Sequence, residues 1–134
     1  MNPKVFTFLM FEGNAEEAMT FYVSLFEDAE IVAVRRYGPG EAGKEGSVMH
    51  AQFRLGDQAF MCIDSPAKHG FTFTPATSIF LVCDGAEEVD RLYGQLSEGG
   101  QVMMPLGEYP FSPRFAWLAD RFGVSWQLSA APPA

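Results

Sequence analysis

The residue best suited to acid–base chemistry is His50, in a segment whose side chains alternate in polarity. In residues 48–55, Ala51 and Phe53 point to one side, whereas His50 and Gln52 point to the other. A histidine on such a face can act as a general base, because its ordinary pKa is about 6.5. The alternative is a histidine that only hydrogen-bonds to its polar neighbours. We name His50 as the candidate catalytic residue and Gln52 as a candidate binding residue.

The second half of the chain carries a similar set of side chains. Gln127 lies on the polar side of residues 124–128, where its amide can line a cavity. Trp117 is a candidate wall of an aromatic pocket, although packing in the core would also explain it. Arg114 points to the side opposite Trp117, where it either binds an anionic group or faces solvent.

Two similar stretches position these residues. Ala15-Glu16-Glu17 recurs as Ala86-Glu87-Glu88, 71 positions later, and each copy opens an amphipathic helical pattern between two apolar runs. A repeat of this length suits a duplicated half-domain rather than a solenoid unit. The paired glutamates belong to the first helical turn, where the helix dipole favours negative charge, and they are not a catalytic carboxylate pair.

Each half is predicted to run strand, helix, strand, strand, strand. The strands are expected over residues 5–11, 29–37, 48–55, 58–63, 78–83, 101–106, 114–118 and 124–128, and the helices over 15–27 and 85–96. Asn14 is expected to cap the first helix, and residues 107–113 are expected to form a loop. Gly38–Gly46 is expected to be a flexible loop that can act as a lid.

The helix of each half can cover only one face of its sheet. Two such sheets that curl around a shared cavity would cover the remaining faces economically. The sequence therefore predicts an α+β fold with duplicated βαβββ modules. It forms a single domain over residues 1–134, with modules at about 1–65 and 76–130.

Bulk properties narrow the classes of partner. The chain has 134 residues and a formal net charge of −8, which argues against nucleic acid and acidic membranes as partners. Neither a basic-then-apolar leader nor a run of roughly 20 apolar residues is seen, so a cytoplasmic protein is expected. Cys62 and Cys83 lie in apolar runs and are predicted to be buried free thiols.

Four motifs together resemble the PhnB-like, 3-demethylubiquinone-9 3-methyltransferase-like branch of the vicinal oxygen chelate superfamily, which also holds glyoxalase and bleomycin resistance proteins. They are Phe-Glu-Gly-Asn-Ala-Glu-Glu-Ala at 11–18, Met-His-Ala at 49–51, Phe-Thr-Phe-Thr-Pro-Ala at 71–76 and Asp-Arg-Phe-Gly-Val-Ser-Trp-Gln at 120–127. The resemblance covers essentially the whole chain and implies the duplicated βαβββ fold. The glycine-rich strand–turn–helix motif expected for S-adenosylmethionine binding is missing from the sequence.

The resemblance also implies where a divalent metal would bind, on the first and last strand of each half. Carried across by the helix register, these positions hold Thr7, Cys62 or Asp64, Ser78, and Gln127. Hydroxyl groups are poor ligands for Zn²⁺ or Ni²⁺, so we predict no metal and no other cofactor. The alternative to a metal-free protein is a divalent metal held by His50, Asp64 and Gln127. The alternative to a binding role for Asp64 is that its side chain simply caps a helix or a turn.

We therefore expect a protein that binds an unknown small molecule in its sheet cavity, with Thr7, Gln52, Asp64, Ser78, Arg114, Trp117 and Gln127 as binding residues. The alternative is a metal-dependent lyase, isomerase or dioxygenase of the same superfamily, and a methyltransferase is the weakest hypothesis. Sheet edges that need partners predict a homodimer.

Overall fold

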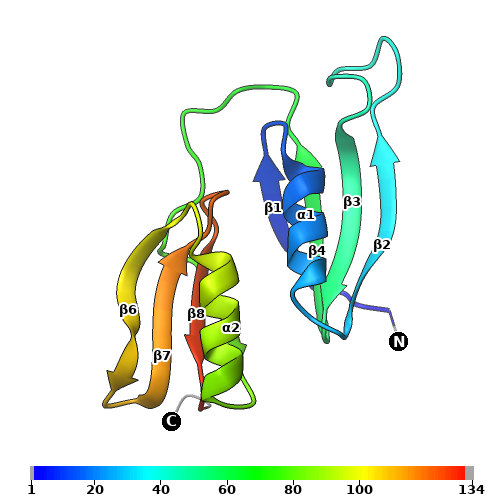
Figure 1. Ribbon diagram of the computed structural model, residues 1–134. Helices are drawn as coiled ribbons and strands as arrows, with labels where there is room; N and C mark the ends of the chain where they lie inside the picture. The colour runs from blue at the N-terminus through cyan, green and yellow to red at the C-terminus, as the bar shows by residue number, and fades with distance from the viewer. Residues whose placement is uncertain (1, 132–134) are drawn as a thin grey trace. The chain divides into compact units, whose positions relative to one another are not determined.

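The computed structural model describes residues 2–131 and divides into two compact units, Met1–Gly70 and Phe71–Ala134 (Figure 1). Each unit contains one helix and one four-stranded sheet, in the order strand, helix, strand, strand, strand. This confirms the predicted α+β fold with duplicated βαβββ modules. Neither helix in the described part of the chain is long and apolar enough to cross a bilayer.

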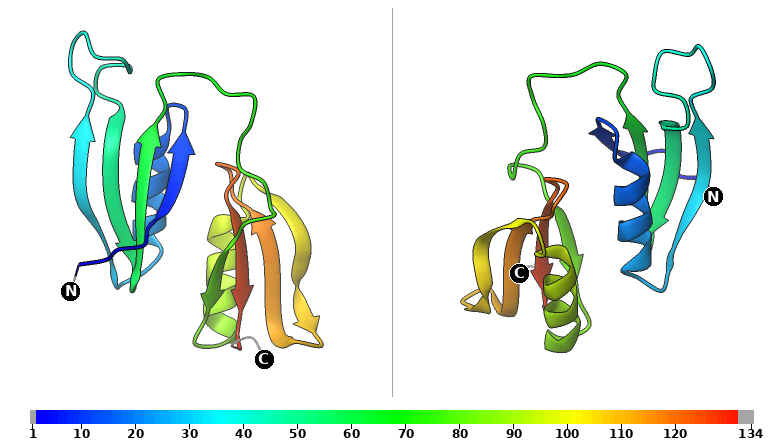
Figure 2. Two further views of the ribbon diagram at one scale, coloured as in Figure 1. Left: turned by 180° about the vertical axis from the view of Figure 1, so that it is seen from behind. Right: turned by 45° about the horizontal axis from the view of Figure 1, so that its top comes forward.

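The first unit forms one mixed sheet. Its elements are β1 (Thr7–Phe11), α1 (Ala15–Ser24), β2 (Ala29–Arg36), β3 (Val48–Leu55) and β4 (Gln58–Asp64). The strand order is β1-β4-β3-β2, and β1 runs parallel to β4 while the other neighbours are antiparallel. The helix α1 covers one face of the sheet, and we call the opposite side the helix-free face (Figure 2).

The second unit repeats this topology. Its elements are β5 (Ile79–Val82), α2 (Ala86–Leu96), β6 (Gln101–Tyr109), β7 (Ser112–Ala119) and β8 (Ser125–Ser129). The strand order is β5-β8-β7-β6, with β5 parallel to β8. The helix α2 again covers one face, so this sheet also has a helix-free face (Figure 2).

Residues 107–113 form part of a hairpin, and the predicted loop is wrong. β6 continues to Tyr109 and β7 begins at Ser112, which leaves a two-residue turn. The ring of Phe115 lies 4.8 Å from that of Phe111 and 5.7 Å from that of Tyr109. These ring contacts favour the extended hairpin. The glycine and the prolines of the segment indicate a loop, and the ring contacts that oppose this tendency cannot be seen in the sequence.

The alternating strand β3 shows how the sequence builds the core. Ala51, Phe53 and Leu55 are buried on the side of α1, while His50 is exposed on the helix-free face. The helices contribute a matching apolar stripe, and its buried members are Ala15, Ala18, Met19 and Tyr22 of α1 and Val89, Leu92 and Leu96 of α2. Each large apolar side chain buried in this way stabilises the fold by roughly 1.5–3 kcal/mol.

The glycine-rich segment between β2 and β3 folds over the ring of Tyr37. The Tyr37 N–H donates to the Ser47 carbonyl at 2.9 Å, and the Gly46 N–H donates to the Tyr37 carbonyl at 2.9 Å. A Cβ atom at Gly43 would collide with the Tyr37 ring, so only glycine fits there. The loop therefore has a fixed base, and its action as a lid stays a prediction.

The start of α1 is capped by Asp64, the last residue of β4. Its Oδ1 accepts hydrogen bonds from the N–H groups of Gly13 at 2.8 Å and Ala15 at 2.9 Å, and its Oδ2 accepts from Val48 at 3.0 Å. The Asn14 side chain makes no capping hydrogen bond, so that prediction is wrong. The carboxylate from β4 reaches the free helical N–H groups instead, because it lies 4% exposed beneath them.

Replacing Asp64 with asparagine tests this capping role. The single amide oxygen of Asp64→Asn can accept either from the N–H groups of Gly13 and Ala15 or from that of Val48, but not from both. Its NH₂ group must then face a buried N–H. An unmatched buried donor costs roughly 1–3 kcal/mol, so we expect the free energy of unfolding in urea to fall by about that amount. Asp57→Asn, at the exposed β3–β4 turn, is the matched control. Equal stability of the two variants would contradict the capping role.

Candidate functional site

A row of four side chains crosses the helix-free face of the second sheet. Strand pairing places Phe80 of β5 opposite Gln127 of β8, Gln127 opposite Trp117 of β7, and Trp117 opposite Met104 of β6. Directly paired residues project their side chains to the same face, so these four are neighbours. Phe80 is 41% exposed, and the other three are half-buried.

Beside this row, three polar side chains form a short chain of hydrogen bonds. The indole Nε1–H of Trp117 donates to Ser125 Oγ at 2.8 Å. Ser125 Oγ and Ser78 Oγ lie 2.6 Å apart. Ser125 is buried, with 1% of its surface exposed, whereas Ser78 is half-buried. The structure thus brings two of the predicted binding residues, Ser78 and Trp117, together through a third that the prediction omitted.

The sequence contains a signal for Ser125, although a weak one. Ser125, Gln127 and Ser129 alternate with large apolar residues in the last strand, so all three belong to one face. What the sequence does not show is the indole of Trp117, which comes from the neighbouring strand. That contact turns an ordinary polar position into part of the site.

No charged side chain belongs to the set that strand pairing places on this face. Its members are Phe80, Val82, Gln101, Met104, Phe115, Trp117, Ala119, Ser125, Gln127 and Ser129. Arg114 lies on the other side, where its Nε donates to Asp90 Oδ1 of α2 at 2.8 Å. The candidate anion-binding arginine is therefore engaged with a helix carboxylate, and the face itself is uncharged.

In the first unit, His50 and Gln52 lie on the helix-free face of the sheet, on the side that the alternation predicts. His50 is exposed and makes no hydrogen bond or ion pair within residues 2–131. Further along the same strand, Arg54 holds Asp28 at 2.7 Å and Glu30 at 3.1 Å. These contacts raise the pKa of Arg54.

Thr7 and Asp64 lie on the opposite side of that sheet, under the helix. Thr7 pairs with Phe60, which is 1% exposed, and its Oγ1 accepts from Gln58 Nε2 at 3.2 Å. Asp64 pairs with Phe11, and both of its oxygens are taken by backbone N–H groups. The structure therefore does not bring Asp64 to the face that carries His50.

Thr7 lies on the helix side because the segment before α1 is one residue longer than the equivalent segment before α2. Three residues separate Phe11 from the first residue of α1, whereas only two separate the equivalent Cys83 from the first residue of α2. An alignment that superimposes α1 on α2 therefore shifts β1 by one residue relative to β5. The counterpart of Thr7 is Ile79, which pairs with the fully buried Trp126 and also lies under its helix.

Both cysteines are free and buried, as predicted. Cys62 Sγ lies 3.9 Å from Met19 Sδ of α1, so this thiol also faces the helix. Burial, reinforced by the charge of Asp64, raises the pKa of Cys62 to about 12. Burial, with Glu88 nearby, raises the pKa of Cys83 to about 12. Neither sulfur is a ready thiolate ligand at neutral pH.

The donor groups present do not fit the divalent metal of the superfamily. Within residues 2–131, no three His, Cys, Asp or Glu side chains gather closely enough to hold an ion. The positions carried over from the superfamily supply a hydroxyl at Ser78 and an amide at Gln127, with Thr7 and Cys62 turned toward the helix side. Zinc and nickel prefer imidazole, thiolate and carboxylate ligands, so a hydroxyl and an amide do not make a site for either ion.

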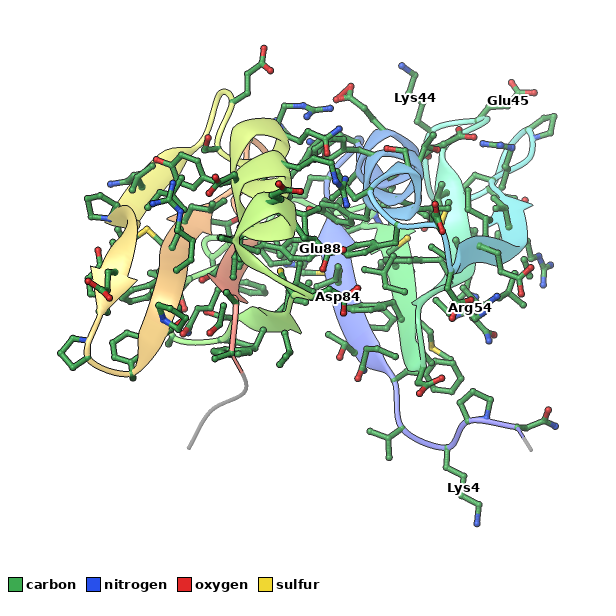
Figure 3. All side chains as sticks on the ribbon, turned by 60° about the horizontal axis from the view of Figure 1, so that its bottom comes forward. Lys4, Lys44, Glu45, Arg54, Asp84 and Glu88 are labelled. Atoms are coloured by element: carbon green, nitrogen blue, oxygen red, sulfur yellow. The ribbon has the colours of Figure 1, made fainter. Side chains whose placement is uncertain are left out.

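A hollow of about 630 Å³ in the first unit is lined by the start of α1 and residues 44–48 and 64–66, with Lys44 and Glu45 from the β2–β3 loop (Figure 3). Two of its carboxylates have partners. Glu16 holds Arg36 at 2.6 Å, a contact that lowers the pKa of Glu16, and Glu12 Oε2 accepts from the His69 N–H at 3.2 Å. The side chains of Lys44 and Glu45 are exposed and make no hydrogen bond or ion pair within residues 2–131, so the hollow combines paired charges with two exposed charges of opposite sign.

Comparison with known proteins assigns the family. The family model described as 3-demethylubiquinone-9 3-methyltransferase matches residues 3–129. The chain belongs to this PhnB-like family. It is 56% identical to a PhnB protein from Bacillus cereus, over 95% of this chain and 98% of that one, with a TM-score of 0.92. Protein PA1353 from Pseudomonas aeruginosa is 33% identical over 96% and 97% of the two chains, with a TM-score of 0.84.

A more distant neighbour shares the fold of the PhnB-like chain. The fosfomycin resistance protein FosX from Listeria monocytogenes, solved with Mn(II), is 14% identical over 98% of this chain and 94% of that chain. Its TM-score of 0.64 shows a shared fold and nothing about a shared reaction. No curated protein matches the chain.

The buried thiols give one prediction for the native protein. At pH 8 we expect Cys62 and Cys83 to react with a chromogenic disulfide reagent far more slowly than free cysteine, because burial keeps both protonated. In denaturant both should react at once. Since the folded pKa of about 12 exceeds the ordinary value, ionisation should lower the stability only as the pH rises from roughly 8.5 toward 12. Rapid reaction of one thiol in the native protein would contradict the structure.

The donor set gives a second prediction. Protein purified without added metal, and protein incubated with Zn²⁺, Mn²⁺ or Ni²⁺ and then desalted, should both hold far less than one ion per chain. Elemental analysis by mass spectrometry measures this directly. A stoichiometric ion that EDTA removes would show that side chains rearrange to build a site absent from the described residues.

Proposed function

We propose that this PhnB-like protein binds a small organic molecule on the helix-free face of the second sheet, without a metal. The observation that carries the proposal is the hydrogen-bond chain Trp117–Ser125–Ser78, set beside exposed apolar side chains. Val82 is 55% exposed and Phe80 is 41% exposed on the same face. A mostly apolar surface with a few placed polar groups is the usual form of a small-molecule site.

The amide of Gln127 supports the same proposal. Within residues 2–131 its side chain makes no hydrogen bond, although it is half-buried between Phe80 and Trp117. An amide offers two donors and an acceptor, so a ligand over this row gains polar contacts without breaking any within the protein. A purely structural glutamine would instead satisfy a buried backbone group.

Methyl transfer is not part of the proposal, although the family description names it. Each unit has one helix on a four-stranded sheet in which only one strand pair is parallel. Sites for adenosine cofactors are commonly built at the carboxyl edge of a parallel sheet, where a glycine-rich turn leads into a helix. The predicted cytoplasmic location and homodimer stay predictions.

An NMR titration with acetophenone, a neutral aromatic probe, tests the proposed site. We expect saturable shifts of the Trp117 indole N–H and the Gln127 side-chain amide, because both lie on the proposed surface. The indole N–H of Trp126 is the internal control, since it is buried on the helix side and donates to Asp120 Oδ2 at 2.8 Å. Absence of shifts up to the solubility limit, or shifts confined to the first unit, would refute the site.

A further inference from the structure

The directions of the hydrogen bonds around Ser125 can be derived from burial. An indole N–H can only donate, so Ser125 Oγ accepts in its 2.8 Å bond with Trp117. The hydroxyl proton of Ser125 must then find its own acceptor, because the residue is 1% exposed and a buried donor without a partner is costly. Within the described residues, the only other hydrogen-bond partner of the Ser125 hydroxyl is Ser78 Oγ at 2.6 Å. Ser125 therefore donates to Ser78.

This direction determines what Ser78 presents to the surface. Its oxygen accepts from Ser125, and its own proton is left pointing away from that bond. Within residues 2–131 the Ser78 hydroxyl makes no other hydrogen bond, and the residue is only half-buried. The chain thus runs one way, from the Trp117 N–H to the Ser78 O–H. Successive bonds in such a chain polarise one another and strengthen the last donor.

We propose that Ser78 is the donor that recognises the ligand, and that the ligand is an uncharged, planar apolar molecule carrying an acceptor oxygen such as a carbonyl. This inference rests on the proposed function and specifies its ligand class. The ring systems of Trp117 and Phe80 supply an apolar surface for a planar body. Trp117 is also a positioning residue, since its N–H fixes the orientation of the Ser125 hydroxyl.

The side chains that strand pairing places on this face are uncharged, which disfavours an ionic ligand. No Lys, Arg or His belongs to the set that pairing places there, so a carboxylate would lose its hydration without gaining a cation. A neutral carbonyl loses less hydration and gains the oriented Ser78 donor. Gln127 stands two residues from Ser125 on β8, about 7 Å along the strand, and can contact a second polar group of the ligand.

Three probes of similar size distinguish a neutral ligand with an acceptor oxygen from a purely apolar ligand and from an anion. They are acetophenone; ethylbenzene, which lacks the oxygen; and benzoate, which is charged. Affinities come from NMR titration of the Trp117 indole N–H. We expect acetophenone to bind roughly tenfold more tightly than either of the others, the difference that one hydrogen bond can make. In Ser78→Ala the affinity for acetophenone should fall to that for ethylbenzene. Ser97→Ala, at the end of α2, is the matched control and should behave as wild type.

A second variant tests the direction of the chain. Trp117→Phe keeps an aromatic ring but removes the N–H, which frees Ser125 to rotate. The smaller ring should weaken both ligands to a similar extent, so the readout is the ratio of the two affinities, and we expect part of the preference for acetophenone over ethylbenzene to be lost. Titration of this variant is followed at the Gln127 side-chain amide. A variant that retains the full preference would overturn the positioning role.

The outcomes distinguish this inference from the proposed function. Equal affinity for acetophenone and ethylbenzene, a preference for benzoate, or an unchanged Ser78→Ala would overturn the ligand class while the site stands. Failure of all three probes to shift Trp117 in the wild-type protein would overturn both. If Ser78→Ala fails to fold, as judged by its urea unfolding curve, the order of affinities in the wild-type protein still decides the ligand class.

Discussion

The bond between Trp126 and Asp120 is the constraint on which the second unit depends. Asp120 is 3% exposed, and its Oδ2 accepts from the Trp126 indole N–H at 2.8 Å. Its Oδ1 accepts from the backbone N–H groups of Phe122 and Val124, which closes the turn between β7 and β8. Because successive side chains of a strand point to opposite faces, Ser125 must point to the helix-free face when Trp126 points toward the helix. Core packing and the candidate site are thus two consequences of one register.

A shared fold can support different chemistry, because the fold alone does not determine the reaction. The scaffold shared with FosX fixes where strands bring side chains together, but not which groups those side chains carry. Here the helix-free face of the second sheet carries hydroxyl, amide and indole groups. Such groups orient a neutral ligand through directed hydrogen bonds, whereas a bound divalent ion polarises substrate oxygens directly. The binding that we propose for the PhnB-like chain therefore depends on hydrogen-bond direction rather than on charge.

Periodic features of the fold could be predicted from the sequence, and features that depend on distant contacts could not. β3 was placed at residues 48–55, as observed, and alternation put His50 and Gln127 on the helix-free faces of their sheets. The sequence allowed Asp64 a capping role but did not show that it caps α1, because Asp64 lies 49 residues from the N–H of Ala15 that it holds. Thr7 was named as a binding residue by alignment of the helices, and that alignment does not reveal the extra residue before α1 that puts Thr7 on the helix side.

The direction of the hydrogen bond between Ser125 and Ser78 decides whether Ser78 can donate to a ligand, and neutron diffraction from a crystal exchanged into D₂O locates that deuteron directly. We expect nuclear density on the line from Ser125 Oγ toward Ser78 Oγ, bonded to Ser125, with the Ser78 deuteron directed away from Ser125. A deuteron bonded to Ser78 and pointing at Ser125 would refute this direction, because Ser78 would then have no donor left to offer a ligand.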